Sequence, residues 1–281
     1  MSPAINAQTT VTVSHASSDA AVLAAMVKAV ENAGAHLLTR FDSERSPPTS
    51  LADVVDAIHA NDNAALALLR GPLEAARPQA GWVEDELEGG PLAAGEWWLV
   101  DPVEGNINHV QGLPDTWGVS ATLVRDNLPV LTAVHVPVTG TTYTAVRNGG
   151  AFENGERLRV SAKSELHAAL VATGQAKPGE DAQTYRRIGE SVTAMLHAAL
   201  VVRVTVPATF QLVALARGGL DAFWQHSQVR SGLAAGALLV AEAGGTVTDM
   251  AGQPWTVAST NFLASAPGVH AAALQTLATV A

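Results

Sequence analysis

The sequence of 281 residues contains no cysteine, which excludes disulfide bonds, thiolate metal ligands and a cysteine nucleophile. Charged residues make up only 15% of the chain and hydrophobic residues 48%, so the composition is that of a folded protein with a large core. Positive charge is scarce. The formal net charge of −10 argues against a nucleic-acid partner, because phosphate contacts need clustered Lys and Arg. An acidic protein can still bind a phosphorylated metabolite when a metal ion supplies the positive charge.

Long apolar runs are also missing, and we expect no segment that spans a membrane. Residues 1–21 lack the basic stretch followed by an apolar stretch that marks a signal peptide. We therefore expect a cytoplasmic protein without a membrane partner. Residues 1–17 are small and polar, and we expect them to be disordered.

The first half of the chain predicts two helices followed by strands. Apolar residues recur at helical spacing over residues 18–41 and 51–76, with an interruption expected near Asn61. Residues 96–100, "EWWLV", predict a short strand buried on both faces. Residues 117–160 then alternate apolar and polar positions between four turn signals, which predicts an antiparallel meander. Those turn signals are Asp126–Asn127, Thr139–Gly140, Asn148–Gly149 and Asn154–Gly155.

The second half alternates predicted strands and helices. Strands are expected at residues 170–175, 201–206 and 220–225, helices at 182–200, 208–219 and 231–245, and a hairpin at 246–255. This pattern is typical of a layered α/β fold. The change in pattern predicts an N-terminal α+β lobe at 18–165 and a C-terminal α/β lobe at 166–281, packed as one unit.

Four stretches in a fixed order resemble the inositol monophosphatase superfamily: "WVEDE", "WLVDPVEGNINHVQGLP", "AVRNGGAFENGERLRVS" and "AAGALLVAEAGGTVTD". The resemblance implies a layered α-β-α-β-α sandwich, often assembled as a homodimer. It also implies Mg²⁺-dependent hydrolysis of a small phosphate monoester, such as a sugar, polyol or nucleotide phosphate. In such enzymes, carboxylates gather Mg²⁺ ions that neutralise phosphate oxygens and activate water.

The resemblance carries specific roles onto this sequence. Metal ligands are implied at Glu84, Asp101, Val103 and Glu104. Asp62 and Asn106 match the pair that orients the attacking water, and the backbone N–H groups of Gly105 and Asn106 match the phosphate cradle. The neighbours of the substrate are implied to be Gly105, Asn106, Gln225, Arg230 and Gly232.

Four of these positions depart from the family pattern. Glu104 and Gly232 stand where the family has Asp, Asn106 stands for Thr, and Gln225 stands for Glu. Loss of the carboxylate at Gly232 removes a fixed oxygen ligand, and Mg²⁺ usually needs more than one fixed carboxylate. We therefore expect an incomplete metal site that binds fewer Mg²⁺ ions than the family pattern implies. At the extreme, it would bind no ion without a ligand.

The residues by themselves leave alternatives open. Asp101 and Glu104 could form a capping box, Glu84 could be one of several solvated acids with Asp85 as its rival, and Asp62 could be a surface residue. Arg230 could be an exposed loop residue, or it could supply positive charge where a metal once sat. The function divides in the same way. The protein is either a phosphatase with impaired activity or a repurposed homologue that binds or transforms an anionic metabolite, using Arg230 and His226.

Overall fold

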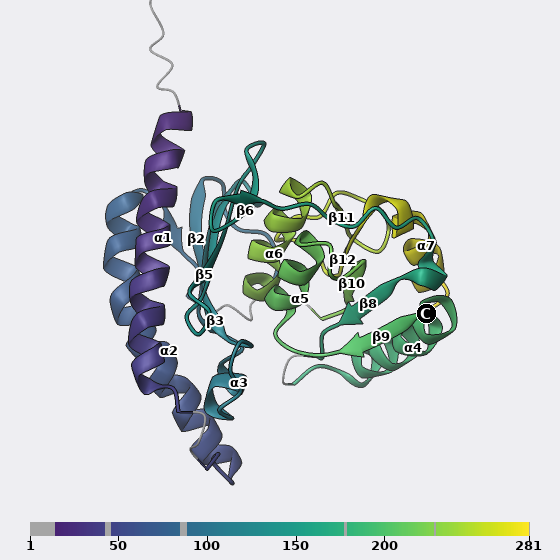
Figure 1. Cartoon of the computed structure of the whole chain (residues 1–281), viewed down its shortest axis with the longest axis horizontal. Coiled ribbons are helices and arrows are strands. Elements are labelled where there is room, and N and C mark those ends of the chain that lie inside the picture. Colours follow the sequence, from purple (N-terminus) through teal and green to yellow (C-terminus); the bar gives the residue numbers. More distant parts are fainter. Residues whose placement is uncertain (1–14, 43–45, 85–88, 177–178, 228, 281) are drawn as a thin grey trace, which may run out of the picture.

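The computed structural model describes residues 15–42, 46–84, 89–176, 179–227 and 229–280. Its helices and sheets form five layers, which follow one another from left to right in Figure 1. The outer layer is a helix pair, α1 (His15–Arg40) and α2 (Leu51–Ala76). The predicted α-β-α-β-α sandwich is confirmed.

The second layer is a seven-stranded sheet in the order β1-β2-β3-β4-β5-β6-β7. Its strands are β1 (Gly81–Trp82), β2 (Glu96–Glu104), β3 (Gly118–Arg125), β4 (Leu128–Val136), β5 (Thr141–Val146), β6 (Gly150–Glu153) and β7 (Glu156–Arg157). The central layer is the helix pair α5 (Ala208–Ala216) and α6 (Arg230–Glu242).

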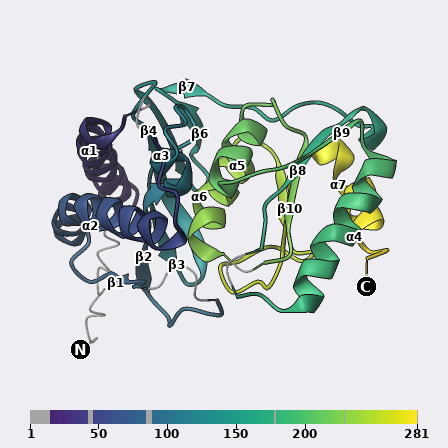
Figure 2. The same ribbon diagram turned by 90° about the horizontal axis from the view of Figure 1, so that it is seen from below.

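The fourth layer is a five-stranded sheet in the order β11-β12-β10-β8-β9. Its strands are β8 (Leu170–Thr173), β9 (Val201–Val204), β10 (Ala222–Gln225), β11 (Thr246–Thr248) and β12 (Phe262–Ser265). The last layer is α4 (Ala182–Ala198) with α7 (Pro267–Leu277). Figure 2 shows the two outer helix pairs at opposite ends of the molecule. Two short helices, α3 (Asn106–Val110) and a 3₁₀ turn (Leu166–Ala168), complete the chain.

The apolar periodicity of the first two helices fixes how they pack. α1 buries Val22, Met26, Val30 and Leu37, and this stripe belongs to the same core cluster as the first sheet. The expected interruption of α2 near Asn61 is wrong. Asn61 is a buried residue inside a continuous helix, because its amide finds hydrogen-bond partners there.

By length and a mean hydropathy of 1.2, residues Asp19–Arg40 could also cross a membrane, although no such segment was expected from the sequence. A single helix of this kind is weak evidence of a membrane span, since the core helix of a soluble protein has the same properties. Here its apolar stripe is covered by the first sheet.

The predicted meander is confirmed in the first sheet, where β2 to β7 pair with their sequence neighbours in antiparallel fashion. The turn residues Asp126, Asn127, Asn148 and Asn154 have positive φ, which Asn and Asp tolerate better than most side chains. The preceding strand is longer than "EWWLV" and continues to Glu104.

The second half differs from expectation at its end. Residues 246–255 do not form a free-standing hairpin. β11 pairs instead with β12, and only the bridge between Thr248 and Pro254 closes the turn. Neither β12 nor α7 was expected. The division into lobes at 165/166 stays a prediction. So does disorder at residues 1–14, which lie outside the described residues, whereas residues 15–17 begin α1.

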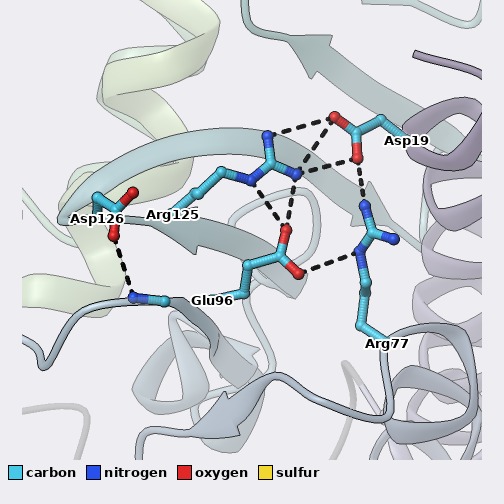
Figure 3. A network of polar contacts seen from close by, with 6 residues as sticks. Asp19, Arg77, Glu96, Arg125 and Asp126 are labelled. Atoms are coloured by element: carbon cyan, nitrogen blue, oxygen red, sulfur yellow. Dashed lines mark hydrogen bonds and ion pairs between the residues drawn. The ribbon is translucent and has the colours of Figure 1, made fainter. Parts of the chain in front are cut away.

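A charged network holds the far end of β2 in place (Figure 3). The guanidinium of Arg125 lies 3.1 Å from Asp19 and 2.7 Å from Glu96, and Arg77 contacts the same two carboxylates. These four residues come from α1, β2, β3 and the residue that ends α2, so the network ties the outer helix pair to the first sheet.

Candidate functional site

The candidate site lies where β2 ends. In a regular strand, residues three apart point to opposite faces of the sheet. Between Asp101, which pairs with Ser120, and Glu104, which pairs with Gly118, the register of β2 shifts. This irregularity lets both carboxyl groups reach the same cavity, and their side chains are hydrogen-bonded to each other.

Gly105 turns the chain from β2 into α3. Its φ of 70° lies in the left-handed region, and a Cβ there would lie 2.5 Å from the carbonyl oxygen of Thr116. A glycine is therefore required. The carbonyl of Gly105 accepts hydrogen bonds from the backbone N–H groups of Asn108 and His109, and the helix begins at Asn106. The predicted helix start at Gly105 and Asn106 is confirmed.

A cavity of about 260 Å³ opens beside this turn. Eight of the ten candidate residues line it: Asp62, Asp101, Val103, Glu104, Gly105, Asn106, Gln225 and Gly232. They come from α2, β2, α3, β10 and α6, segments that are far apart in the sequence. Apolar side chains such as Ile107 and Val206 form much of the remaining wall.

Glu104 is almost fully enclosed, with 1% of its surface exposed. Burial raises the pKa of its carboxyl group, although hydrogen bonds from Thr209, Ser120 and Asp101 act against this rise. The Thr209 hydroxyl lies 2.7 Å from Glu104 Oε1 and 2.9 Å from the carbonyl oxygen of Gly232. A hydroxyl has one hydrogen, so the Thr209 hydroxyl is shared between these two acceptors. Burial therefore favours the neutral form of Glu104, and the hydrogen bonds that it accepts favour the charged form, with burial the larger effect.

Asp62 also borders the cavity, from α2. Its pKa is raised by burial, which outweighs the hydrogen bond from Asn106 and the charge of His59. The Asn106 amide donates to Asp62 Oδ1 at 2.7 Å and to the carbonyl of Ile58 at 3.0 Å. Both hydrogens of that amide are therefore committed.

The structure does not bring Glu84 into the cavity. Its side chain is 73% exposed and forms an ion pair with Arg70. It lines a neighbouring cavity of about 700 Å³, which shares Asp62 with the first one. The alternative acids Asp85 and Glu86 lie outside the described residues.

Arg230 likewise lies away from the cavity. It is 5% exposed, and its Nη2 donates to the carbonyl of Gly90 at 2.7 Å beside a small cavity bordered by Trp255. Arg230 is therefore a buried residue and not an exposed loop residue, which was one of the alternatives.

The last two candidates line the cavity from β10 and α6. Gln225 is 4% exposed and donates to the carbonyl of Ser227 at 3.1 Å, while its Oε1 leaves no room for a side chain at Gly174. Gly232 lies in the first turn of α6. A Cβ added there would meet nothing closer than Val229 Cγ1 at 3.7 Å, so the position is open to a side chain.

Sequence reasoning missed the polar partners of the site residues, among them Asn61, Ser120 and Thr209. Asn61 carried a usable signal, because it continues the buried spacing of Ala65, Leu69 and Leu73 along α2. A polar residue on such a face needs a buried partner. Ser120 and Thr209 carried none, since their partner Glu104 comes from another element.

The donor set for a metal ion is small. In the part of the chain that the structure describes, no three His, Cys, Asp or Glu side chains gather closely enough to hold one. Asp101 and Glu104 remain as a pair. Proteins commonly hold Mg²⁺ through one or two carboxylates together with substrate phosphate, so this pair fits one such ion but not a cage made of protein alone.

The fold and the site define a member of a phosphatase family. The Inositol monophosphatase family model matches residues 18–280, and the chain belongs to this family. An inositol-1-monophosphatase of Rhizobium meliloti is 34% identical over 236 residues, covering 83% of this chain and 86% of that protein.

Other relatives carry different names. A fructose-1,6-bisphosphatase/inositol-1-monophosphatase of Thermotoga maritima is 32% identical over 173 residues, 62% of this chain and 64% of its own length. The crystal structure of the extragenic suppressor protein SuhB from Bartonella henselae superposes with a TM-score of 0.77 at 27% identity, covering 92% of this chain and 98% of that one.

Proposed function

We propose that the protein hydrolyses a small phosphate monoester in the cavity at the end of β2, with Mg²⁺ as cofactor and with an activity lowered by the missing carboxylate at Gly232. The observation that supports this most is the irregular end of β2. It places Asp101 and Glu104 together beside the left-handed turn at Gly105 and the start of α3. Cytoplasmic location and a homodimer belong to the same proposal, and the homodimer rests on the family resemblance.

The charges around the cavity suggest how ligand and ion depend on each other. Among the described residues, its wall holds three acidic side chains, Asp62, Asp101 and Glu104, and no Lys or Arg. A phosphate alone would face like charge, and a lone Mg²⁺ would find only two carboxylates. Each should therefore raise the affinity for the other, and by the same factor, because coupling between two bound ligands is reciprocal.

The residues present have definite roles in this proposal. Asp101 and Glu104, with the backbone carbonyl of Val103, would hold the ion, which would neutralise phosphate charge and lower the pKa of water. Asp62 would accept a hydrogen bond from the attacking water. Asn106 can only hold Asp62 in place, because an amide does not take up a proton as part of a relay. Gly105 and Asn106 would offer backbone N–H groups to the phosphate.

The volume limits the substrate. A cavity of about 260 Å³ lies at the small end of ligand sites, which span ~300–1,000 Å³. We therefore propose a sugar or polyol phosphate in preference to a nucleotide.

Calorimetry with Mg²⁺ in the presence and absence of inorganic phosphate tests whether the two ligands bind cooperatively. Phosphate release from a panel of monoesters tests turnover. We expect Mg²⁺ binding to strengthen at least about 10-fold with phosphate, a typical coupling between linked ligands. Asp101→Asn, which keeps the shape and removes the charge, should abolish both binding and turnover. Equal phosphate affinity with and without Mg²⁺, or an Asp101→Asn variant that turns over normally, would refute the proposal.

The second candidate is a pocket that binds an anionic metabolite without hydrolysing it. It is favoured by the enclosed Glu104 and by the Asn106 amide, whose two hydrogens are already used. The cations expected for such a role are poorly placed. Arg230 donates to Gly90, and burial, assisted by Arg187, lowers the pKa of His226 to about 4, so that His226 is neutral at pH 7. Tight metabolite binding without turnover in the same assay would support this candidate.

A further inference from the structure

A continuous chain of hydrogen bonds, buried at its centre, runs from α1 through α2 and α3 to the cavity. Arg40 Nε donates to Asn61 Oδ1 at 3.2 Å, and Asn61 Nδ2 lies 3.0 Å from Asn106 Oδ1 and 3.1 Å from His109 Nδ1. His109 Nε2 lies 3.3 Å from the carbonyl oxygen of Leu37. The Asn106 amide then donates to Asp62, which borders the cavity.

The direction of each bond follows from the groups at the ends. A guanidinium only donates, so Asn61 must turn its oxygen toward Arg40 and its NH₂ inward. A carbonyl only accepts, so the Ile58 carbonyl fixes the NH₂ of Asn106 and leaves its oxygen toward Asn61. The two ends give the same order of donors, and Asn61 uses both of its hydrogens.

The same logic fixes the state of the histidine. The Leu37 carbonyl requires a proton on His109 Nε2, and the NH₂ of Asn61 requires a bare Nδ1. His109 is packed edge-on against Trp117, with ring centres 4.6 Å apart, and it is 4% exposed. Packing therefore holds the ring in place while the hydrogen bonds hold its tautomer.

We propose that Asn61 and His109 are positioning residues, which lock the Asn106 amide so that it donates to Asp62 Oδ1 and leaves the second oxygen of Asp62 for a hydroxyl or water in the cavity. Among the described residues, that second oxygen has no hydrogen-bond donor. The ligand group that binds there is thus a hydroxyl or water that donates a hydrogen bond to this oxygen. The catalytic consequence rests on the proposed function, whereas the order of donors does not.

Nitrogen-15 NMR of the histidine rings in the unmodified protein tests the order of donors, with His109→Gln used to assign the signal. We expect a neutral His109 that carries its proton on Nε2. A proton on Nδ1 at pH 7 would overturn the proposal. This measurement requires no enzyme activity.

Asn61→Asp keeps the shape of the side chain and replaces the donor group with an acceptor. We expect the new carboxylate to draw a proton onto His109 Nδ1. Unchanged signals from the His109 ring would contradict the proposed chain of hydrogen bonds. In a phosphatase assay we expect kcat to fall with little change in KM, by up to about 100-fold, the loss typical of a misplaced group. Thr132→Val, which removes the buried Thr122–Thr132 hydrogen bond in the first sheet, is the matched control and should keep kcat.

The outcomes separate the two proposals. An inactive unmodified protein with the expected tautomer refutes the proposed function and retains the hydrogen-bond order. A changed tautomer in Asn61→Asp with unchanged kcat refutes positioning for catalysis. Should Asn61→Asp fail to fold, the tautomer of the unmodified protein still decides the order of donors.

Discussion

Gly232→Asp is the sharpest test of the incomplete metal site. The structure leaves space for the new side chain, since a Cβ at Gly232 would lie 3.7 Å from Val229, 3.9 Å from Thr209 and 4.0 Å from Ala208. Gly232 lies within α6 rather than at a left-handed turn, so the backbone imposes no strain on the substitution. The new carboxylate would enter a cavity that already contains Asp101 and Glu104.

The effect of Gly232→Asp on the free energy of unfolding depends on whether a cation is present. Replacing a helical glycine gains up to about 0.5 kcal/mol in helix propensity, and an acid in the first turn gains about 0.3–1 kcal/mol from the helix dipole. Without Mg²⁺, burial and like-charge repulsion oppose both gains, so Gly232→Asp should be less stable than Gly232→Asn. At a Mg²⁺ concentration 100 times the dissociation constant, binding adds about 2.7 kcal/mol. For a chain of this size the stabilisation corresponds to roughly 5 °C in Tm.

The assay compares thermal melting of Gly232→Asp, Gly232→Asn and the unmodified protein in EDTA and in rising Mg²⁺. We expect a Mg²⁺-dependent shift in the Asp variant that the isosteric Asn variant lacks. Adding Glu104→Asp and Asn106→Thr should raise phosphate release by about 100-fold, the usual effect of one electrostatic contact in catalysis. A folded Asp variant whose shift equals that of the Asn control would show that Gly232 is not a lost ligand position, and the reasoning would fail.

Three further predictions concern stability, each checked by urea unfolding. Asp221 accepts from Lys163 Nζ at 2.7 Å; burial alone would raise its pKa, but this bond and others together lower it. Asp221→Asn should therefore lower the free energy of unfolding by about 1.5–3 kcal/mol at pH 7. This difference between the variant and the unmodified protein should vanish as the pH falls through the folded-state pKa of Asp221. A difference that stays constant with pH would contradict the prediction. Because burial raises the pKa of Glu104, the unmodified protein should lose stability as pH rises above about 4.3, the unfolded value. Glu104→Gln should remove this loss between pH 5 and pH 8, and parallel pH profiles would argue against it. A double-mutant cycle of Asp19→Asn and Arg125→Met should give a coupling of about 0.5–3 kcal/mol that weakens in high salt, and additive effects would exclude coupling across the network.

Much of the fold could be predicted because its signals are local. The buried stripe of α1 has a helical period, and each turn between β3 and β6 contains Asn, Asp or Gly in a positive-φ conformation that these residues tolerate. The predictions failed where a helix or strand depends on partners that are distant in the sequence. Asn61 looked like a break in α2 because a polar residue lowers a local helix signal, yet hydrogen bonds to Asn106 and His109 satisfy it. β11 looked like half of a hairpin because its true partner, β12, follows a longer connection.

The sequence by itself determined the family, the end of β2 and the turn at Gly105, since each depends on residues that are close together in the chain. It also indicated the change at Gly232. Only the tertiary structure decided which carboxyl groups line the cavity at the end of β2 and which partners each of them has. Glu104 is enclosed by Ser120 and Thr209 from two other elements, while Glu84 pairs with Arg70 and lines a different cavity. Burial and hydrogen-bond partners set the charge of a carboxyl group, and both are properties of the packed molecule that no local pattern contains.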